Sequence, residues 1–438
     1  MHTEAVADAP TSIDVDRKTV TRVAWASFVG TFIEFYDYFI YGAAAALIFP
    51  KLFFSGLPPV TASIVSFATL GVTFITRPLG AVIFGHYGDT IGRKTMLVLS
   101  LMIMGVATFL IGLLPTYEMI GVWAPILLVT IRLLQGVAVG GEWGGATTMI
   151  IEYAPANRRG FYGTFVQLGN VFGLLTSTAA FAVASSLDEA SFMSWGWRIP
   201  FLVSIVLLAV GMFIRLRIPE PPAFQRLKEK RKDTTMPLVT VFRNHPKEIF
   251  AAAGMRFSEN VLGYLIISWI LSYATTTLGI SRQVALEGVM LAAASGIISF
   301  PLYGLLSDYI GRRAVFLFGA LAACAYAFPF FWLLDTGSPE LMKVALVIGY
   351  GVILASMYAI EPSYFSEMFA TNVRYTGVSL GYQLASIVGG FTPMMAAGLL
   401  AWSGGASWPI SLLLLAASAI TALCVILVGE TSQRTIVE

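Results

Sequence analysis

The sequence predicts an all-α membrane protein in which twelve transmembrane helices form two pseudo-symmetric six-helix bundles. Its composition is the first reason, because 57% of the 438 residues are hydrophobic and only 12% are charged, whereas soluble domains carry about 25% charged residues. The second reason is a series of long apolar runs. The third is a charged turn that recurs after half the length of the chain.

A membrane-spanning helix needs about 20 mostly apolar residues. Twelve stretches meet this requirement, and turns with Pro, Gly or charged residues separate most of them. We expect helices at 22–48, 62–87, 95–114, 122–150, 160–185, 198–217, 249–276, 285–306, 314–334, 341–366, 376–401 and 408–428.

The longest interruption contains three prolines followed by the basic stretch R-L-K-E-K-R-K. It lies between the sixth and seventh runs, so we expect it to link two bundles. The predicted organisation is a cytoplasmic tail at 1–21, an N-terminal bundle at 22–217, a cytoplasmic linker at 218–247, a C-terminal bundle at 248–428 and a cytoplasmic tail at 429–438.

Lysine and arginine set the predicted orientation, because they are enriched in cytoplasmic segments of membrane proteins. Of the 27 Lys and Arg residues, 20 fall in the tails, the linker and the turns on the same side, 4 fall on the other side and 3 lie within runs. We therefore expect a multi-pass protein of the cell inner membrane with both termini in the cytoplasm.

A charged turn occurs twice, as G-H-Y-G-D-T-I-G-R-K and, 219 residues later, as G-L-L-S-D-Y-I-G-R-R. A repeat at half the chain length predicts two similar halves. Glycines allow close helix approach, and the aspartate can cap a helix or meet an arginine. We expect a cytoplasmic gate that includes Gly85, Asp89, Arg93, Lys94, Asp308, Arg312 and Arg313.

A second repeated pattern follows the fourth and tenth runs. Glu152 precedes Arg159 by seven residues, and Glu367 precedes Arg374 by the same spacing. We expect each glutamate to pair with its own arginine across a helix exit. Such inner-face ion pairs would hold one arrangement of the halves and break in the other.

The two turns resemble the signature of the major facilitator superfamily of transporters. E-F-Y-D-Y in the first run, T-R-P-L-G at 76–80, V-G-G-E-W-G-G at 139–145 and S-W-G-W-R-I-P-F at 194–201 resemble its metabolite:proton symporter family. That family includes shikimate, 2-oxoglutarate, citrate and proline/betaine carriers. The resemblance covers nearly the whole chain and implies a central site between two bundles, alternating access and proton-coupled uptake.

Eight charged residues fall inside predicted spans. A charge at the bilayer centre costs roughly 2.5–3.5 kcal/mol, so eight facing lipid would exceed a typical protein stability of about 5–15 kcal/mol. We expect them to face the protein interior, a watery cavity or one another. Buried ion pairs that only fix helix packing are the alternative. The eight are Glu34, Asp37, Arg77, Arg132, Glu142, Arg256, Glu259 and Glu361.

Helical spacing groups some of these residues. Glu34 and Asp37 are three residues apart and share a helix face, which Tyr38 and Tyr41 extend. The seventh run carries a parallel pattern. In the family fold the first and seventh helices both line the cavity, so we expect six residues to face it: Glu34, Asp37, Tyr38, Arg256, Glu259 and Tyr264.

The fourth run contains R-L-L-Q-G, from Arg132 through Gln135, which resembles a pattern of proton-coupled carriers. A buried arginine changes the proton affinity of a nearby carboxylate, which coupling requires. Glu142 lies on nearly the same face, and Glu361 follows it by 219 residues. Arg77 precedes a proline, so it either contacts substrate or satisfies carbonyls that the proline frees.

The predicted function is proton symport of a small organic acid, because arginines suit a carboxylate and acidic residues suit protons. The fifth run lacks the Gly-Pro pair of antiporters in the superfamily, which favours symport. Proton-coupled uptake of a zwitterionic osmolyte, such as proline or betaine, is the alternative. A membrane receptor or scaffold that docks through its basic linker is more remote.

Other functions find little support. The three histidines lie in the tail, a turn and the linker, so no enzyme site is expected. Cys324 and Cys424 lie in apolar runs and are expected to be free. We expect no cofactor, no metal and, with a net charge of +2, no nucleic-acid partner. The expected partners are a small-molecule substrate, protons and the lipid bilayer, and we expect a monomer.

Overall fold

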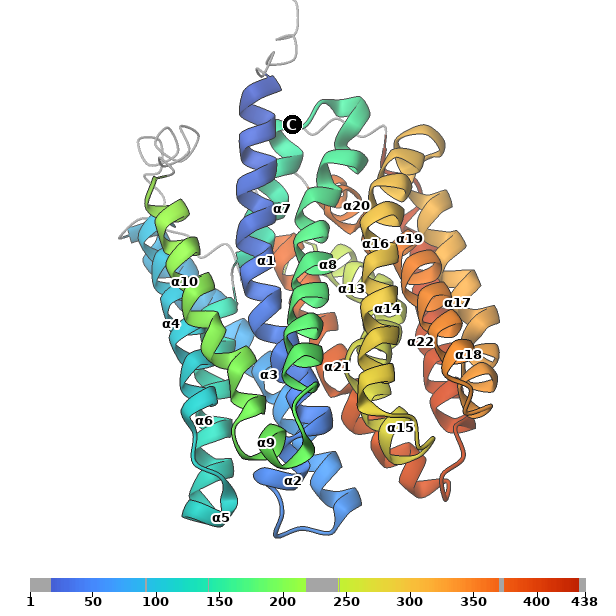
Figure 1. Ribbon diagram of the computed structural model, residues 1–438. Helices are drawn as coiled ribbons and strands as arrows, with labels where there is room; N and C mark the ends of the chain where they lie inside the picture. The colour runs from blue at the N-terminus through green and yellow to red at the C-terminus, as the bar shows by residue number, and fades with distance from the viewer. Residues whose placement is uncertain are drawn as a thin grey trace, which may run out of the picture.

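The structure is a computed structural model that describes residues 17–90, 93–140, 142–217, 243, 245–369 and 374–432. The described residues form helices joined by short turns, and they contain no strand. Long helices lie side by side with their axes roughly aligned (Figure 1). Within this part of the chain, nine helices or helix runs are long and apolar enough to cross a membrane.

The first half of the chain supplies six long elements and several short connecting ones. The long ones are α1 (Arg17–Leu47), α3 (Pro59–Thr90), α4 (Arg93–Leu113), α6 (Trp123–Val139) continued by α7 (Glu142–Tyr153), α8 (Arg159–Ala184) and α10 (Ile199–Arg217). The short ones are α2 (Phe49–Leu52), α5 (Tyr117–Ile120), η1 (Ala156–Arg158), α9 (Glu189–Ser194) and η2 (Gly196–Arg198).

The second half repeats this arrangement. Its seventh element is α13 (Pro246–Met255), α14 (Phe257–Tyr264), η3 (Leu265–Trp269) and α15 (Ile270–Thr276). Its tenth is α18 (Pro339–Val347), η4 (Ile348–Leu354), α19 (Ala355–Tyr358) and α20 (Glu361–Met368). The others are α16 (Arg282–Ile310), α17 (Arg312–Asp335), α21 (Arg374–Trp402) and α22 (Trp408–Val428).

Each predicted run therefore corresponds to one helix or one interrupted helix, and the predicted fold class is confirmed. The predicted linker falls almost wholly on residues outside the described ranges, so the domain boundaries stay predictions. Cys324 and Cys424 are both free.

Two runs that the sequence shows as continuous are interrupted, and a third passes through Gly141, which lies outside the described residues. Arg256 lies between α13 and α14, outside either helix. Glu142 is the first residue of α7, and Glu361 is the first residue of α20. In α20 the next residue is Pro362, which lacks the N–H that a continuous helix would need. Hydropathy averaged over about 20 residues does not reveal these points.

Glu361 occupies a favourable place at its interruption. The first turn of a helix presents free N–H groups and the positive end of the helix dipole, which stabilise a carboxylate. Glu142 and Glu361 are 219 residues apart, the offset of the repeated turn. The matching offset leaves open whether they hold equivalent positions in the two halves.

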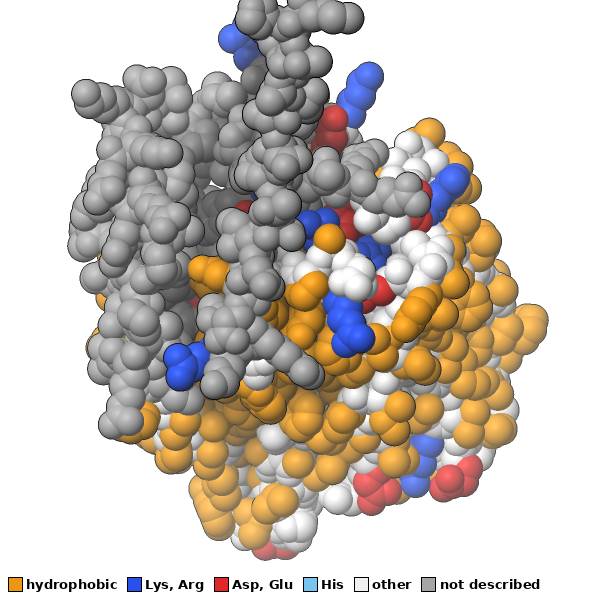
Figure 2. Space-filling model, turned by 90° about the horizontal axis from the view of Figure 1, so that it is seen from above, with side chains coloured by type: hydrophobic (Ala, Val, Ile, Leu, Met, Phe, Trp, Pro, Cys, Tyr) orange, Lys and Arg blue, Asp and Glu red, His pale blue; other side chains and the backbone are white. Residues whose placement is uncertain are grey.

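The two ends of the molecule differ. α1 begins and α22 ends at one end, which we call the termini face, and α2, α5 and α9 lie at the opposite end, the distal face (Figure 1). Seen from the termini face, acidic and basic side chains gather over the middle, and hydrophobic side chains cover the flank (Figure 2).

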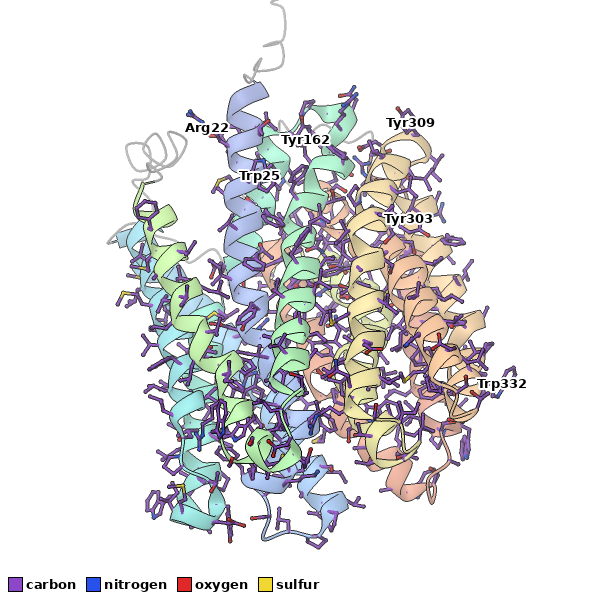
Figure 3. All side chains as sticks on the ribbon, in the orientation of Figure 1. Arg22, Trp25, Tyr162, Tyr303, Tyr309 and Trp332 are labelled. Carbon is purple, nitrogen blue, oxygen red and sulfur yellow. The ribbon has the colours of Figure 1, made fainter. Side chains whose placement is uncertain are left out.

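Exposed aromatic side chains mark the outer surface. Trp25 and Tyr309 lie near the termini face, and Trp332 points outward from α17 toward the other end (Figure 3). Their exposed fractions are 55%, 85% and 66%. Because amphipathic aromatic rings are enriched where a membrane meets water, these positions fit a membrane-embedded outer surface.

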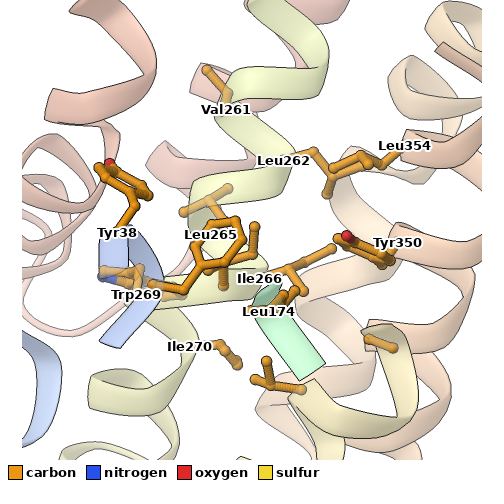
Figure 4. Close-up of a cluster of buried hydrophobic side chains, with 14 of the residues drawn as sticks. Tyr38, Leu174, Val261, Leu262, Leu265, Ile266, Trp269, Ile270, Tyr350 and Leu354 are labelled. Carbon is orange, nitrogen blue, oxygen red and sulfur yellow. The ribbon is translucent and has the colours of Figure 1, made fainter. Parts of the chain in front are cut away.

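Helices from the two halves also pack against each other. α1 contacts η3 and α15, α3 contacts α21, and α8 contacts α16. Leu265 and Ile266 of η3 belong to one buried cluster with Tyr38 of α1, Leu174 of α8 and Tyr350 of η4 (Figure 4). The buried core is therefore continuous from one half to the other, and the site lies within this interface.

Candidate functional site

A cavity lies between the two halves near the middle of the molecule. The cavity has a volume of about 40 Å³, which is room for roughly three water molecules. Its lining consists of Phe35, Phe39, Phe74, Arg77 and Asn170 from the first half, and Arg256, Glu259, Asn260, Gly263, Tyr264, Ile267, Tyr350, Leu354, Tyr358, Tyr382 and Ser386 from the second.

Arg256 forms the centre of a buried ion cluster. Its Nη2 lies 2.7 Å from Glu259 Oε1, and its Nε lies 3.2 Å from Glu361 Oε1. Its Nη1 donates to Tyr382 O at 2.8 Å and to Ser386 Oγ at 3.0 Å. One guanidinium thus faces two carboxylates, and the interruption between α13 and α14 places it there.

Asn260 supports this cluster from the next position in the helix. Its Nδ2 donates to Glu259 Oε1 at 3.0 Å and to Arg256 O at 2.9 Å. Burying charged groups is tolerated only where polar partners replace the lost water. The second-half side of the cavity is therefore a largely satisfied polar network before any ligand enters.

Arg77 presents a different environment on the first-half side. Its guanidinium carbon lies 4.2 Å from the centroid of Phe74 and 5.6 Å from that of Tyr38. Among the described residues it forms no ion pair within 4 Å, and its Nε has no hydrogen-bond partner. A buried arginine on aromatic faces, with donors to spare, is suited to receive an anion.

A second, smaller cavity lies inside the first half. Its volume is about 10 Å³, which is close to the minimum needed for one water molecule. Arg77 lines both cavities and separates them. The other lining residues are Glu34, Asp37, Tyr38, Thr73, Met104, Arg132, Gln135 and Val139.

Arg132 occupies the wall of this smaller cavity. Its Nη1 donates to Gln135 Oε1 at 2.8 Å, and its guanidinium carbon lies 3.7 Å from the centroid of Tyr41. Gln135 Nε2 donates in turn to Thr108 Oγ1 at 2.9 Å. Two Arg132 nitrogens and Asp37 Oδ1 have no hydrogen-bond partner among the described residues.

The predicted cavity residues therefore divide into two groups. Arg256, Glu259 and Tyr264 line the central cavity as expected. The expectation for Glu34, Asp37 and Tyr38 needs correction, because they line the smaller cavity instead. They do share a helix face, but in this structure that face is directed toward α3, α4 and α6 of their own half.

Three further predicted residues lie outside both linings. Tyr41 is fully buried beneath Arg132, and its hydroxyl lies 2.6 Å from Thr69 Oγ1. Glu361 stands behind Arg256, which it contacts. Glu142 is buried at the start of α7.

Sequence reasoning missed the neutral polar lining. Asn170 Nδ2 donates to Tyr358 Oη at 3.2 Å, and Tyr350 Oη donates to Asn170 Oδ1 at 3.4 Å. Tyr382 and Ser386 also contact Arg256. A polar residue inside an apolar run could have marked Asn170. The tyrosines carry no charge, so no comparable signal marks them.

At the termini face, the second repeated turn joins the two halves. Asp308 of α16 accepts the backbone N–H groups of Gly160 and Phe161 at 2.8 and 2.9 Å. These groups form the start of α8 in the other half. Arg312 donates to Asp308 at 2.6 Å and pairs with Glu367 at 3.2 Å. The contribution of this turn to a gate stays a prediction.

The predicted pairing of each glutamate with the arginine seven residues later is wrong. Glu152 pairs with Arg374 of the opposite half, 3.2 Å away, and Glu367 pairs with Arg312. The reason is that α7 ends next to the start of α21 in the other half, so spatial neighbours replace sequence neighbours. Arg159 forms no ion pair within 4 Å among the described residues. Arg313 contacts Ile426 O at 3.4 Å.

The first repeated turn cannot be compared in the same way. The predicted gate residues Gly85, Asp89, Arg93 and Lys94 lie outside the residues whose side chains the structure describes. Their role stays a prediction.

A segment after α22 also contacts the second repeated turn, and no pattern in the sequence marks this segment. Glu430 accepts the backbone N–H groups of Arg312 and Arg313, each at 3.0 Å. Thr431 Oγ1 donates to Glu367 at 2.8 Å. Burial alone would raise the pKa of the Glu430 carboxyl, but backbone N–H donors, including that of Ser432, outweigh burial and lower the pKa.

At the distal face, one ion pair also spans the halves. Arg282, at the start of α16, lies 2.9 Å from Glu189 of α9. Its guanidinium carbon also lies 3.9 Å from the centroid of Phe192. Contacts therefore join the halves at both faces.

Comparison with known proteins agrees with this geometry. The chain is 39% identical over 422 residues to the shikimate transporter of Escherichia coli strain K12, covering 94% of this chain and 95% of that one. It is 32% identical over 413 residues to the proline/betaine transporter of the same strain, covering 92% and 82%.

Among solved structures, a D-xylose-proton symporter superposes with a TM-score of 0.73 at 17% identity, covering 95% of this chain and 99% of the other. At that identity the likeness shows the fold alone. The sequence description of the Major Facilitator Superfamily matches residues 27–393. The chain is a multi-pass membrane transporter rather than an enzyme, and it belongs to the Major Facilitator Superfamily.

Proposed function

We propose that the protein is a proton-coupled symporter that imports a small organic acid across the inner membrane by alternating access. The observation that carries the proposal is the contrast between two cavity arginines. Arg256 is held by Glu259 and Glu361, whereas Arg77 has no acidic partner within 4 Å among the described residues. Arg77 is thus the group available to a substrate carboxylate.

The remaining lining favours an acid that also carries hydroxyl groups. Asn170, Tyr350, Tyr358 and Ser386 offer neutral donors and acceptors around the cavity. A site that hydrogen-bonds substrate hydroxyls discriminates strongly against analogues that lack them. The relative that transports shikimate, a hydroxylated cyclic acid, supports this choice.

Proton coupling is assigned to the ion cluster around Arg256. Two carboxylates facing one guanidinium leave one negative charge uncompensated, and a proton on Glu259 or Glu361 removes it. A substrate carboxylate on Arg77 balances that second arginine in the same way. Proton and acid together therefore leave the cavity close to neutral, which favours closure around both.

The contacts at the two faces support alternating access. The Asp308 and Glu152 contacts close the termini face, and the Arg282–Glu189 pair joins the halves at the distal face. We assign the termini face to the cytoplasm because Lys and Arg concentrate in its segments. Opening each face in turn exposes the central cavity to one compartment.

Uptake of a zwitterion is the second candidate, and one observation favours it. The cavity carries aromatic faces, including Phe39, Phe74 and Tyr264, and such faces bind quaternary ammonium groups. The proline/betaine transporter relative agrees with this reading. Arg77 does not separate the two candidates, because a betaine also carries a carboxylate. The neutral hydrogen-bonding side chains of the lining are what favour the hydroxylated acid.

The driving force separates the candidates. A monoanion moving with one proton is electroneutral, so a pH gradient alone drives it. A zwitterion with one proton also gains about 2.3 kcal/mol per 100 mV of membrane potential. We would reconstitute the full chain in liposomes and measure uptake of radiolabelled shikimate and glycine betaine under each gradient separately.

The expected result is shikimate uptake under the pH gradient, insensitive to potential alone, and no concentrative uptake of betaine. An Arg77→Gln variant should lose uptake, and Lys51→Gln, which removes an exposed charge on α2, should retain it. Betaine uptake driven by potential would replace the leading proposal with the second one. Uptake of shikimate without any proton dependence would refute symport.

A further inference from the structure

Tyr382 of α21 lies between two flat groups that come from different halves. Its ring stacks on Trp143 of α7, with centroids 3.7 Å apart and planes at 21°. The guanidinium carbon of Arg256 lies 3.4 Å from the centroid of the same ring. Each face of a ring has room for only one group over its centre at van der Waals distance, so the two occupy opposite faces. We call this Trp143–Tyr382–Arg256 arrangement the sandwich.

All three side chains of the sandwich are buried, each with less than 5% of its surface exposed. Arg256 also donates to the backbone oxygen of Tyr382 at 2.8 Å, so Tyr382 holds the guanidinium through its ring and its backbone. Trp143 is fixed in turn, because its Nε1 donates to Gln167 Oε1 at 3.3 Å. A cation on an aromatic face is held more firmly when water is excluded.

The sandwich borders the central cavity. Tyr382 and Arg256 line that cavity, and Trp143 lies behind them. From the sandwich, α7 and α21 continue to the Glu152–Arg374 pair, which is roughly 12–14 Å of helix. A Cβ added to Gly144 would overlap the Ser379 hydroxyl, so α7 and α21 meet in close contact here. We call this contact the α7–α21 seam.

Trp143 is the member of the sandwich that belongs to the first half. When the halves separate at the seam, the Tyr382 ring loses the group that covers one of its faces. The ring is then free to leave the plane on which Arg256 rests.

We propose that Trp143 is a positioning residue that couples closure of the α7–α21 seam to the geometry of the Arg256–Glu259–Glu361 cluster. The consequence for transport rests on the proposed proton coupling. The structural coupling does not depend on which substrate the protein carries. Conversely, a change of charge in the cluster alters how Arg256 sits on Tyr382, and Trp143 senses that change through the ring.

The groups that face the cluster limit what can titrate there. Apart from Glu259 and Glu361, they are arginine or tyrosine, whose charges stay constant between pH 5 and 8 at ordinary pKa values. Glu142 precedes Trp143 in the chain and is the further carboxylate to control. The arginine and tyrosine groups around the cluster are Arg77, Tyr264, Tyr350, Tyr358 and Tyr382.

Trp143 itself provides a readout that needs no substrate. We would record tryptophan emission of the purified full-length protein from pH 5 to 8 and subtract that of a Trp143→Phe variant. The difference should change along one titration. It should stay constant when the same comparison is made in a Glu259→Gln/Glu361→Gln background, and it should persist with Glu142→Gln.

A matched control is Trp197→Phe, which replaces a fully buried tryptophan among Phe49 and Phe53. The Trp197 contribution should not depend on pH. A Trp143 contribution that is constant in the wild-type background overturns the proposal. So does one that still titrates when both glutamates are glutamines.

Transport gives the second test, in proteoliposomes with shikimate as the probe. Trp143→Phe keeps a stacking ring and should keep the wild-type pH profile. Trp143→Ala should lower proton-driven uptake about tenfold and shift the midpoint of its pH profile. Identical profiles for both variants would contradict a positioning role. If the wild type moves no shikimate but the Trp143 emission titrates, the proposed function fails and the coupling stands.

Discussion

Asp308 of the second half accepts the backbone N–H of Gly160 in the first half at 2.8 Å, and that of Phe161 at 2.9 Å. The carboxylate thereby caps the start of α8 across the interface between the halves. Arg312 holds the same carboxylate at 2.6 Å from its own half. A residue of the repeated turn thus recognises the backbone of the opposite half, which needs no particular side chain there.

Asp308→Asn should open the termini face. Two charge-assisted hydrogen bonds to helix N–H groups are weakened, at about 1.5–3 kcal/mol for each bond to a charged group. The population with that face open should rise by tenfold or more. It can be measured as the rate at which a cysteine placed at Ser379, in the α7–α21 seam, reacts with a water-soluble maleimide after Cys324 and Cys424 are replaced.

Glu152→Gln is the matched comparison for that experiment. Glu152 also forms a contact across the halves, but 45% of its side chain is exposed, and exposed ion pairs contribute about 0–1 kcal/mol. Its effect on the labelling rate should be several-fold smaller than that of Asp308→Asn. If Glu152→Gln opens the face as much, the Asp308 cap is not the principal closing contact.

Gly160→Ala should hinder closure of the same face without unfolding the protein. A Cβ at Gly160 would lie 2.5 Å from Gly304 O and 2.8 Å from Asp308 Oδ1, and such overpacking typically costs about 1–3 kcal/mol. The site is in the first turn of α8, where alanine is a better helix former than glycine. The thermal unfolding midpoint should therefore change little while the cysteine at Ser379 becomes more reactive.

Gly398→Ala is the control for that variant, because a Cβ there meets nothing within 4 Å. It should leave the labelling rate unchanged and should not lower the unfolding midpoint. An unchanged labelling rate for Gly160→Ala would mean that the α8–α16 contact does not close as tightly as this structure shows.

The apolar pattern predicted the helices well, because a long apolar run has few alternatives to a membrane span. It did not predict the interruptions at Arg256 and before Glu361, because hydropathy averaged over about 20 residues does not resolve single polar residues or a proline. Spacing showed that Glu34 and Asp37 share a face, but not which neighbours that face meets. The structure therefore corrects the expected location of Glu34 and Asp37, which line the smaller cavity of the first half and not the central one.

The ion pairs at the termini face also show that residue spacing does not predict partners on other helices. Glu152 and Arg159 are close in sequence, yet Glu152 pairs with Arg374 of the other half. A partner on another helix is set by how the two halves dock, which spacing within one half does not encode. Glu430 went unnoticed for a related reason, because its partners are backbone N–H groups that leave no side-chain signature.

Arg77→Lys should weaken substrate binding although it keeps the charge. Lysine lacks the planar fork that binds a carboxylate through two donors, and it stacks less well on Phe74. Loss of one charged hydrogen bond, about 1.5–3 kcal/mol, corresponds to a rise in KM for shikimate uptake of roughly tenfold to a hundredfold. The maximal rate should change less than KM.

The control for this prediction is Lys51→Arg, an exchange of the same kind at an exposed position of α2, which should leave KM unchanged. A variant Arg77→Lys with wild-type KM and a reduced maximal rate would show that Arg77 acts in the conformational cycle instead of in substrate binding.

Glu430→Gln should destabilise the protein in a manner that depends on pH. In the folded state the pKa of Glu430 is lowered. As the pH falls, the Glu430 carboxylate is therefore protonated in the unfolded chain before it is protonated in the folded protein. Its stabilising contribution is therefore complete above the ordinary glutamate pKa of about 4.3. It is lost as the pH falls through the lower folded-state pKa.

The unfolding midpoint of Glu430→Gln should accordingly lie below that of the wild type by a constant amount between pH 6 and 8, and the two should converge below about pH 4. Glu118→Gln, a change at an exposed residue of α5, should produce no such pattern. A difference between Glu430→Gln and wild type that grows as the pH falls from 8 to 6 would mean that another group, and not this carboxylate, carries the charge that caps α17.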